Sequence, residues 1–587
     1  MIKIELQPEG RVLEVKAGTN LMKALQKNGV RVKSPCGGKG TCKKCKVEIL
    51  DGTVFRKVLS CQVKVREDLV VRVDSDQHLF ADRKSTLNNA NTIPVDGTVR
   101  AKDIQVPPVA NGEKSASLDR LLEALGGEKK VSLELLKRIP SLVDSKGAQL
   151  QAVWEHKRLL GLFPQTGGRY GIAVDIGTTT VVCQLIDLDN GAMVGVCSDS
   201  NPQGETGADV ISRVGYQAED PANSTELQDM ILETVNAMTG RLVREAGITS
   251  DRVFKAVFCG NTVMLHLFLG LDARQIAHAP YVPPMRSAGP FRAKELGLAI
   301  CPDARVHLLP SIAGYVGGDT TAMILSLGLD RTKKTVLAVD IGTNGEIVLA
   351  HKRELYTCST AAGPAFEGAV IEFGMRADEG AIERVHIGPG TYRLETIGKA
   401  PASGLCGSGL IDAVSHFRQT GLIDARGKIV KPDLVPPESA FLVERIGTWN
   451  NLPAILVAAE AKGAQTDIWL TQSDIRELQL GKAAILAGVS RLMKMAGLAP
   501  GDVDKVVLAG AFGNYINPDS ALGIRMLPEF SRKTIKPVGN AAGWGAALCL
   551  GSAKQRARAL KISQQAGYLE LSVDPDFHST FMDAIMF

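Results

Sequence analysis

The chain has 587 residues, of which 45% are hydrophobic, and a formal net charge of +5 at neutral pH. This length suffices for several domains with buried cores, and so small a net charge gives no reason to expect a nucleic-acid-binding protein. No apolar run is long enough for a membrane helix, and the opening residues MIKIELQPEG lack the layout of a secretory signal. The eleven cysteines do not have the spacing of a disulfide framework, so we expect reduced thiols and a cytoplasmic protein.

The pattern of apolar residues divides the chain into three regions. Residues 1–80 alternate short strands with one helix. Residues 81–167 are more polar and contain two short amphipathic segments, so we expect a linker or middle region rather than a domain with its own core. From residue 168 to residue 587, strands, turns and helices alternate, which predicts a large α/β domain.

Four cysteines in the first region have the character of iron–sulfur ligands. Cys36, Cys42 and Cys45 share one glycine-rich loop, and Cys61 follows later. Four thiolates can ligate a [2Fe–2S] cluster, and glycines let the loop wrap closely around it. A zinc site is the alternative. Zinc ligands usually come as two separated C-x2-C pairs, however, and among these four cysteines only Cys42 and Cys45 form such a pair. The spacing resembles that of plant-type and adrenodoxin-like ferredoxins, with a longer first gap than the plant type and a shorter gap before Cys61.

Two copies of the sequence Asp-Ile-Gly-Thr each lie between two apolar strands in the third region. Consecutive backbone N–H groups in such turns can bind phosphate, hydroxyls can add donors, and the aspartates would face Mg²⁺ through its water ligands. One copy is a weak signal, because Asp-x-Gly turns are common in hairpins. Two copies in equivalent contexts indicate a duplicated fold with a phosphate clamp between its halves. The candidate residues are Asp175, Gly177, Thr178, Thr179 and Thr180 in the first turn, and Asp340, Gly342, Thr343 and Asn344 in the second.

The paired turns resemble the phosphate motifs of the actin, Hsp70 and sugar-kinase superfamily. The resemblance implies an adenosine-binding loop, which matches residues 506–513 and contributes Gly510 and Gly513. It also implies an acidic residue that positions the attacking water, and Asp319 suits this role by its position; a helix N-cap is the alternative for Asp319. A further glycine cluster, formed by Gly404, Gly407 and Gly409, is expected to contact the nucleotide, with a helix-entry loop as its alternative.

The whole chain resembles the reductive activators of corrinoid-dependent methyltransferases. The resemblance rests on the four cysteines, both Asp-Ile-Gly-Thr turns, and the sequences Ala-Gly-Ala-Phe-Gly and Gly-Leu-Cys-Gly-Ser-Gly. It implies a multidomain α+β and α/β protein: an N-terminal β-grasp [2Fe–2S] ferredoxin domain, a small linker, and a duplicated actin-like (ribonuclease H-like) ATPase domain. The implied cofactors are the [2Fe–2S] cluster, ATP and Mg²⁺.

The same resemblance implies a function and partners. Such a protein returns one electron to a corrinoid protein whose cobalt has slipped from Co(I) to inactive Co(II), and ATP drives the step. The implied partners are that corrinoid protein and an upstream low-potential electron donor, and a homodimer is a further expectation. Two alternatives from other classes are a metabolite kinase with a fused ferredoxin domain and a redox sensor or scaffold that nucleotide switches between shapes.

Overall fold

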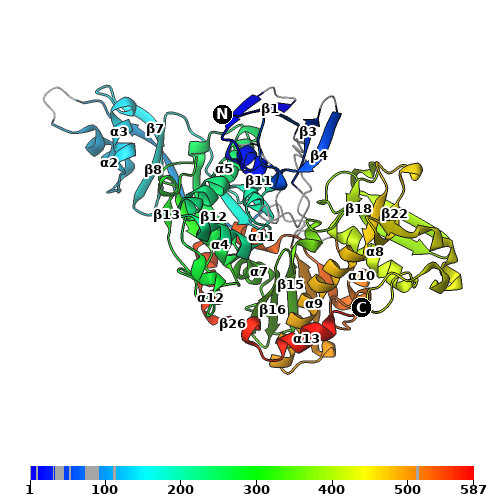
Figure 1. Cartoon of the computed structure of the whole chain (residues 1–587). Helices are drawn as coiled ribbons and strands as arrows, with labels where there is room; N and C mark the ends of the chain where they lie inside the picture. The colour runs from blue at the N-terminus through cyan, green and yellow to red at the C-terminus, as the bar shows by residue number, and fades with distance from the viewer. Residues whose placement is uncertain are drawn as a thin grey trace.

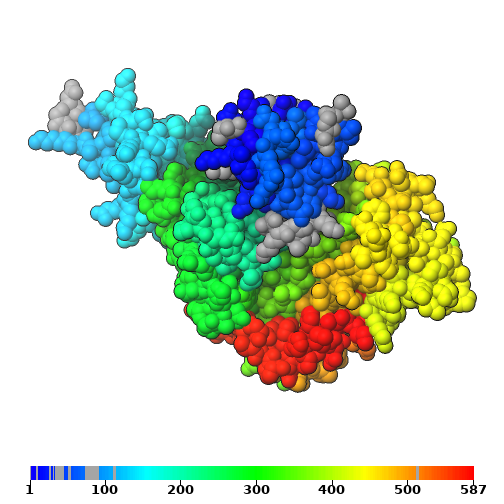
Figure 2. All heavy atoms as spheres, in the orientation of Figure 1, coloured from blue at the N-terminus to red at the C-terminus, as the bar shows by residue number. Residues whose placement is uncertain are grey.

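The computed structural model describes residues 2–7, 11–28, 30, 32, 45–51, 54–72, 92–109, 114–510 and 515–587. Three of the candidate site residues, Cys36, Cys42 and Gly513, lie outside this part of the chain. Figure 1 shows a central body with a small unit projecting on one side, coloured cyan, and a lobe on the other, coloured yellow. In Figure 2 the N-terminal domain, in blue, forms a separate mass on the upper face of the body.

The N-terminal domain is a five-stranded mixed sheet with one helix. The strands lie in the order β2-β1-β5-β3-β4, and β1 pairs antiparallel with β2 and parallel with β5. Alternate residues of β1, Ile4 and Leu6, are buried in one core with Leu21 and Leu25 of the helix. This is the predicted β-grasp arrangement. Its elements are β1 (Ile2–Gln7), β2 (Arg11–Val15), α1 (Leu21–Lys27), β3 (Lys46–Asp51), β4 (Val54–Leu59) and β5 (Leu69–Arg72).

Residues 92–163 form a second folded unit, which we call the linker unit. Its antiparallel sheet β6-β7-β8 is covered by two helices, and it has a core of its own that includes Ile104, Leu121 and Leu135. The expectation that this region lacks a core is therefore wrong. The core was not predicted because the sheet is so small that two short amphipathic helices suffice to cover one of its faces. The elements are β6 (Val99–Val106), α2 (Ser117–Leu125), α3 (Leu133–Leu142), β7 (Ala148–Glu155) and β8 (Arg158–Phe163).

The linker unit is fixed to the central body rather than loosely attached. Val153 and Phe163 belong to the core of the body. Lys255 of the body forms a buried ion pair with Glu155 of the linker unit, with Nζ and Oε1 2.7 Å apart. A buried ion pair needs good geometry and further partners to offset its desolvation, and the Lys255 ammonium also donates to the Thr98 hydroxyl at 2.6 Å. These contacts give the linker unit a defined orientation on the body.

The central body consists of two halves built on the same plan. In each half an antiparallel three-stranded meander continues into two parallel strands: β11-β10-β9-β12-β14 in the first half and β17-β16-β15-β24-β25 in the second. One long helix covers the meander in each case, α5 in the first half and α9 in the second. This repeat confirms the predicted duplication.

The strands and helices of the two halves have the following bounds. The first half contains β9 (Tyr170–Ile176), β10 (Thr180–Asp187), β11 (Met193–Ser200), α4 (Val210–Glu219), α5 (Ala222–Glu245), β12 (Val253–Gly260), α6 (Thr262–Phe268), β13 (Phe291–Arg292), β14 (Arg305–Leu308) and α7 (Gly318–Leu327). The second half contains β15 (Val336–Ile341), β16 (Gly345–His351), β17 (Glu354–Thr360), α9 (Gln472–Met495), β24 (Lys505–Ala509), α10 (Pro518–Gly523), β25 (Ile535–Pro537), β26 (Gly567–Tyr568) and α13 (Phe577–Ala584).

Two helices from the end of the chain cross back to the first half. Helix α11 (Ala541–Gly551) packs on β9, β12 and α7, and α12 (Ala553–Gln565) packs on α7. The crossing of α11 with α7 is so close that a Cβ on Gly545 would lie 2.2 Å from the Ala322 carbonyl oxygen. Arg558 of α12 donates to Asp330, with Nε and Oδ2 2.7 Å apart. The C-terminal segment therefore joins the two halves, as the red and green elements in Figure 1 show.

The yellow lobe, residues 381–471, is an insertion in the second half with two small sheets. Helix α8 packs on β18, and α10 of the body packs on α8. The lobe contains β18 (Ala381–Gly388), β19 (Thr391–Thr396), β20 (Gly404–Leu405), α8 (Gly407–Gln419), β21 (Ile446–Trp449), β22 (Leu452–Ala458) and β23 (Ile468–Thr471). In the described part of the chain, no helix has both the length and the apolar character that crossing a bilayer would take.

Candidate functional sites

Each Asp-Ile-Gly-Thr sequence forms the tight turn of an antiparallel hairpin, as predicted. In the first turn the Gly177 N–H donates to the Thr180 carbonyl at 3.1 Å, and in the second the Gly342 N–H donates to the Asn344 carbonyl at 3.0 Å. A Cβ on Gly177 would lie 2.5 Å from the Thr180 carbonyl oxygen, so this turn excludes any side chain there. At Gly342 the corresponding distance is 3.6 Å, an ordinary contact, so the second turn is less crowded.

The two turns meet where the halves of the body meet. The hydroxyl oxygens of Thr179 and Thr343 lie 3.2 Å apart, although the residues are 164 positions apart in the sequence. Arg213 holds the first turn in place, because its fully buried side chain donates a hydrogen bond to the Thr178 carbonyl. Asn201 also holds it, because its side-chain amide donates to the Gly177 carbonyl at 2.8 Å. This juxtaposition is the arrangement that a phosphate clamp requires.

Three of the predicted residues, Asp175, Asp319 and Asp340, form an acidic group beside the turns. Burial, followed by the charge of Asp175, raises the pKa of Asp319 to about 7. Burial, followed by the charges of Asp175 and Asp319, raises the pKa of Asp340 to about 8. Sequence reasoning missed a fourth member, Glu346, whose pKa is raised by burial and by Asp319 and Asp340. Within the described residues, no three His, Cys, Asp or Glu side chains converge closely enough to ligate a metal ion directly.

Asp319 lies in the first turn of α7, but it is not the N-cap. Gly317 occupies the cap position, so the N-cap alternative is wrong. The Asp319 carboxylate instead accepts a hydrogen bond from the Thr320 N–H at 2.6 Å. Its role in positioning water stays a prediction.

Asp175 is held by two residues that the sequence analysis did not single out. The Asn540 side-chain amide donates to Asp175 Oδ2 at 2.9 Å, and the Cys259 thiol donates to Oδ1 at 3.5 Å. Asn540 also caps α11, since its Oδ1 accepts from the Gly543 N–H at 2.6 Å. An asparagine before the small-residue run of α11 is a recognisable N-cap signal, but it does not reveal the contact with Asp175.

Gly510 begins the predicted adenosine loop and lies against the second Asp-Ile-Gly-Thr turn, which we call, with its first copy, a phosphate turn after its predicted role. The parallel pairing of β15 and β24 places Ala509 opposite Asp340. Gly510 has a φ of +94°, and a Cβ there would lie 2.5 Å from Asp340 Oδ1. Both observations require glycine at this position. Gly513 lies outside the described residues, so the adenosine role of the loop stays a prediction.

The glycine cluster of Gly404, Gly407 and Gly409 lies in the lobe, at β20 and the start of α8. A Cβ on Gly404 would lie 2.7 Å from the Phe373 carbonyl oxygen, and one on Gly409 would lie 2.0 Å from that of Ile382. Close packing, of Gly404 against the segment before the lobe and of Gly409 within the lobe, is therefore enough to explain two of these glycines. Their contact with nucleotide stays a prediction.

Cys45 and Cys61 lie at the same end of the β3–β4 hairpin. Cys45 immediately precedes β3, Cys61 lies in the single helical turn after β4, and the two strands pair in register. Both cysteines are buried, and the Ser60 N–H donates to the Cys45 carbonyl at 2.8 Å. Two buried thiols at one end of a hairpin fit half of a four-thiolate cluster site, and Cys36 and Cys42 lie outside the described residues.

Comparison with protein-family models divides the chain along these structural lines. Residues 4–68 match the 2Fe-2S iron-sulfur cluster binding domain. Residues 170–332 match the RACo middle region, and residues 334–587 match the C-terminal domain of RACo, the ASKHA domain. These last two matches correspond to the first and second halves of the central body.

Two similar proteins match this chain, one along nearly its whole length and the other along about three fifths of it. The corrinoid activation enzyme RamQ of Eubacterium limosum is 33% identical over 568 residues, which are 95% of this chain and 94% of RamQ. The [Co(II) methylated amine-specific corrinoid protein] reductase of Methanosarcina barkeri is 25% identical over 402 residues, or 62% of this chain and 67% of the reductase.

A solved structure extends the likeness to the fold. The reductive activator for corrinoid, iron-sulfur protein is 33% identical, has a TM-score of 0.75, and aligns with 100% of this chain and 98% of its own. With its 2Fe-2S domain, its ASKHA-type ATPase domain and a relative that matches along almost its entire length, the chain belongs to the RACo family of reductive activators of corrinoid proteins.

Proposed function

We propose that this chain is an ATP-dependent reductive activator, which passes one electron from a [2Fe–2S] cluster to a corrinoid protein and so returns inactive Co(II) to Co(I). The observation that carries this proposal is the presence, in one chain, of a ferredoxin domain with buried Cys45 and Cys61 and of two phosphate turns that meet at Thr179 and Thr343. An electron carrier and a nucleotide clamp in one molecule suit a reduction that needs a second source of free energy.

The cluster would be held by Cys36, Cys42, Cys45 and Cys61. When bound, it supplies a one-electron carrier. In the described part, the chain contributes two thiols at one end of a hairpin and a fold that keeps them buried. Burial and hydrogen bonds near the sulfurs are the means by which a protein adjusts a cluster potential.

The nucleotide would bind where the two turns meet. The backbone N–H groups of the Gly177 and Gly342 turns would face the phosphates, and Gly510 and Gly513 would leave room for adenosine. Asp175 and Asp340 would hold Mg²⁺ through its water ligands, because magnesium keeps several waters when it is bound with phosphates. Asp319 would position the attacking water. Burial is the main cause of the raised pKa values of Asp319 and Asp340, but the charge of Asp175 adds to both, and this interaction among the three carboxylates supports a shared cation.

Nucleotide has an energetic purpose in this scheme. Co(I) has a much lower potential than an ordinary [2Fe–2S] donor, and for one electron each deficit of about 59 mV is a tenfold equilibrium penalty. ATP can offset such a deficit only if the states of the complex bind ATP and ADP with different affinities. The partners in the scheme are a corrinoid protein and an upstream low-potential donor. A homodimer in the cytoplasm completes the proposal.

An anaerobic assay tests the function. The reduced chain, Mg-ATP and a Co(II) corrinoid protein of a methyltransferase system are mixed, and the Co(I) absorption band is followed. We expect the band with wild type, its loss in Cys61→Ser with ATP hydrolysis retained, and its loss in Asp340→Asn with the cluster spectrum retained. The matched control Asp433→Asn changes an exposed carboxylate in the lobe and should behave as wild type. A phosphorylated small molecule without any Co(I) would favour a kinase instead.

A further inference from the structure

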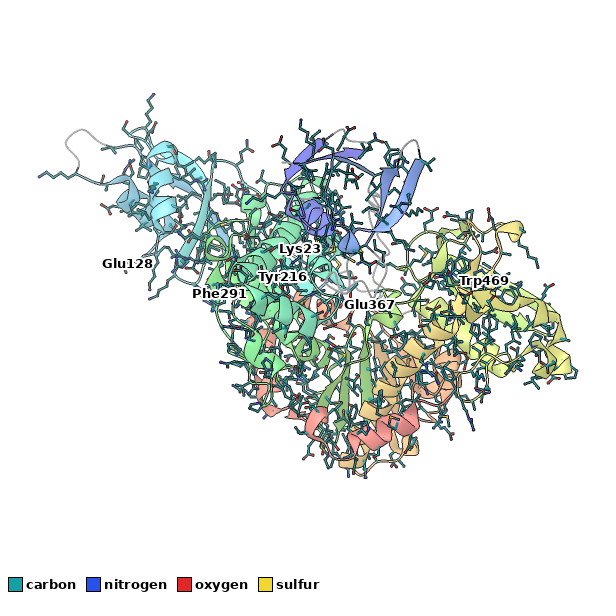
Figure 3. The ribbon with its side chains drawn as sticks, in the orientation of Figure 1. Lys23, Glu128, Tyr216, Phe291, Glu367 and Trp469 are labelled. Atoms are coloured by element: carbon teal, nitrogen blue, oxygen red, sulfur yellow. The ribbon has the colours of Figure 1, made fainter. Side chains whose placement is uncertain are left out.

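One carboxylate oxygen joins the two phosphate turns. Glu367 lies in a short helical turn, Pro364–Glu367, of the second half. Its Oε2 accepts a hydrogen bond from the Thr343 hydroxyl at 2.9 Å and another from the Thr179 hydroxyl. Figure 3 labels Glu367 near the middle of the molecule, where the halves meet. The sequence analysis did not single out this residue.

The segment around Glu367 makes a second contact across the halves. We call residues 361–378 the strap. The strap starts on the second turn, where the Gly363 N–H donates to the Thr343 carbonyl at 2.9 Å. Near its other end, the Arg376 guanidinium donates to the Ser200 hydroxyl, at the end of β11 in the first half. The strap is therefore anchored on one half and reaches the other half at Glu367 and at Arg376, and it leads directly into β18 of the lobe.

The hydrogen bonds of Glu367 involve the same hydroxyls that the sequence assigns to phosphate. A threonine hydroxyl has a single proton, so Thr179 and Thr343 cannot donate to Glu367 and to a phosphate oxygen at the same time. The glutamate carboxylate and a phosphate are both anionic acceptors, so they also repel each other at close range. Burial raises the pKa of Glu367, and the two hydroxyls, Arg376 and Arg213 counteract that rise by stabilising the charged form.

We propose that Glu367 competes with the phosphates of the nucleotide for the hydroxyl protons of Thr179 and Thr343, so that binding of Mg-ATP releases the strap from the first half. This inference rests on the proposed nucleotide site. It identifies the strap as the segment whose contacts change with nucleotide, and the lobe that follows the strap as the part that responds. Glu367 is thus a positioning residue that sets nucleotide affinity.

The test compares Glu367→Gln with Glu372→Gln. Glutamine keeps the shape of the side chain at position 367 but removes the charge that repels phosphate. Glu372 is an exposed glutamate on the same strap whose carboxylate lies near Trp449 and Asn450 instead of the turns, so it is a matched control. Binding of the non-hydrolysable analogue AMPPNP with Mg²⁺ is measured by calorimetry on the full chain. We expect E367Q to bind about tenfold more tightly than wild type, because hydrogen bonds to charged groups are the stronger competitors. E372Q should bind within about twofold of wild type.

Unchanged or weaker binding by E367Q, with wild type binding normally, overturns the competition but leaves the proposed function standing. A wild-type chain that binds no nucleotide overturns both. If E367Q does not fold, hydrogen exchange in the wild type decides the matter. Faster exchange in strap peptides on addition of Mg-AMPPNP supports release, whereas unchanged or slower exchange refutes it.

Discussion

Gly510 offers a sharp test of how the second phosphate turn is built. Gly510→Ala adds a single Cβ, which would lie 2.5 Å from Asp340 Oδ1 and 2.9 Å from the Ile341 carbonyl oxygen. The substitution also places a side chain at a φ of +94°. A non-glycine residue at positive φ costs about 1–2 kcal/mol. The clash requires the Asp340 carboxylate to move by roughly 0.5–1 Å, and misplacing a group in a reacting site by about 1 Å can lower a rate by about 100-fold.

Gly497→Ala separates the two effects. Gly497 has a φ of +67°, and a Cβ there would meet nothing within 4 Å, so this variant has the backbone strain without the clash. We expect both variants to lose about 1–2 kcal/mol of unfolding free energy in urea, with a further loss in Gly510→Ala. Phosphate release from Mg-ATP should fall about 10- to 100-fold in Gly510→Ala alone. The reasoning fails if Gly510→Ala hydrolyses ATP within about twofold of Gly497→Ala.

Further outcomes follow from buried groups elsewhere. Cys45→Ser and Cys61→Ser should each remove or shift the visible absorption and the reduced-state EPR signal of the cluster. The control is Cys406→Ser, which changes a buried thiol in the lobe and should leave both signals intact. An unchanged spectrum in Cys61→Ser would place the fourth ligand elsewhere. Burial lowers the pKa of Lys482 from 10.5 to about 7. Between these two pH values the folded state binds fewer protons than the unfolded state. The cost in folding free energy of burying the Lys482 charge is therefore complete below pH 7 and decreases as the pH rises. The stability of wild type relative to Lys482→Met should therefore increase between pH 7 and pH 9, by at most about 1.4 kcal/mol per pH unit, and equal urea midpoint differences at both pH values would contradict this.

The repeated part of the fold could be predicted because short stretches of neighbouring residues determine its hairpins. Each phosphate turn lies between two short apolar strands, so the hairpins β9–β10 and β15–β16 follow from periodicity and a glycine turn. The linker unit could not be read in the same way. Its sheet presents one face to α2 and α3 and the other to the central body, and a sequence of mixed polarity does not tell a two-sided sheet from a polar connector.

The site was predictable where its residues lie in the turns and not where other segments reach them. Asp175, Asp340, Thr179 and Thr343 come together as the duplicated motifs indicated. Glu346 could have been found, because the tight second turn pairs it directly with Asp340 across the hairpin. Glu367 and Asn540 could not, since nothing local connects them with the turns. Asn540 contacts Asp175 across 365 positions of sequence, through the return of α11 to the first half.

The acidic group and the phosphate turns pose an electrostatic problem that a cation would solve. Burial raises the pKa of Asp175, Asp319 and Asp340, the charge of Asp175 adds to the rise at the other two, and a triphosphate in the turns would add negative charge beside them. At an effective dielectric constant of about 20, each carboxylate that is ionised about 8 Å from a phosphate charge costs about 2 kcal/mol. Backbone N–H groups offset part of this repulsion, but a divalent ion between carboxylates and phosphates converts it into attraction. Nucleotide and Mg²⁺ should therefore bind as a pair, and chelating Mg²⁺ should weaken ATP binding by on the order of 100-fold or more. Equal affinities with and without Mg²⁺ would mean that these carboxylates do not face the phosphates.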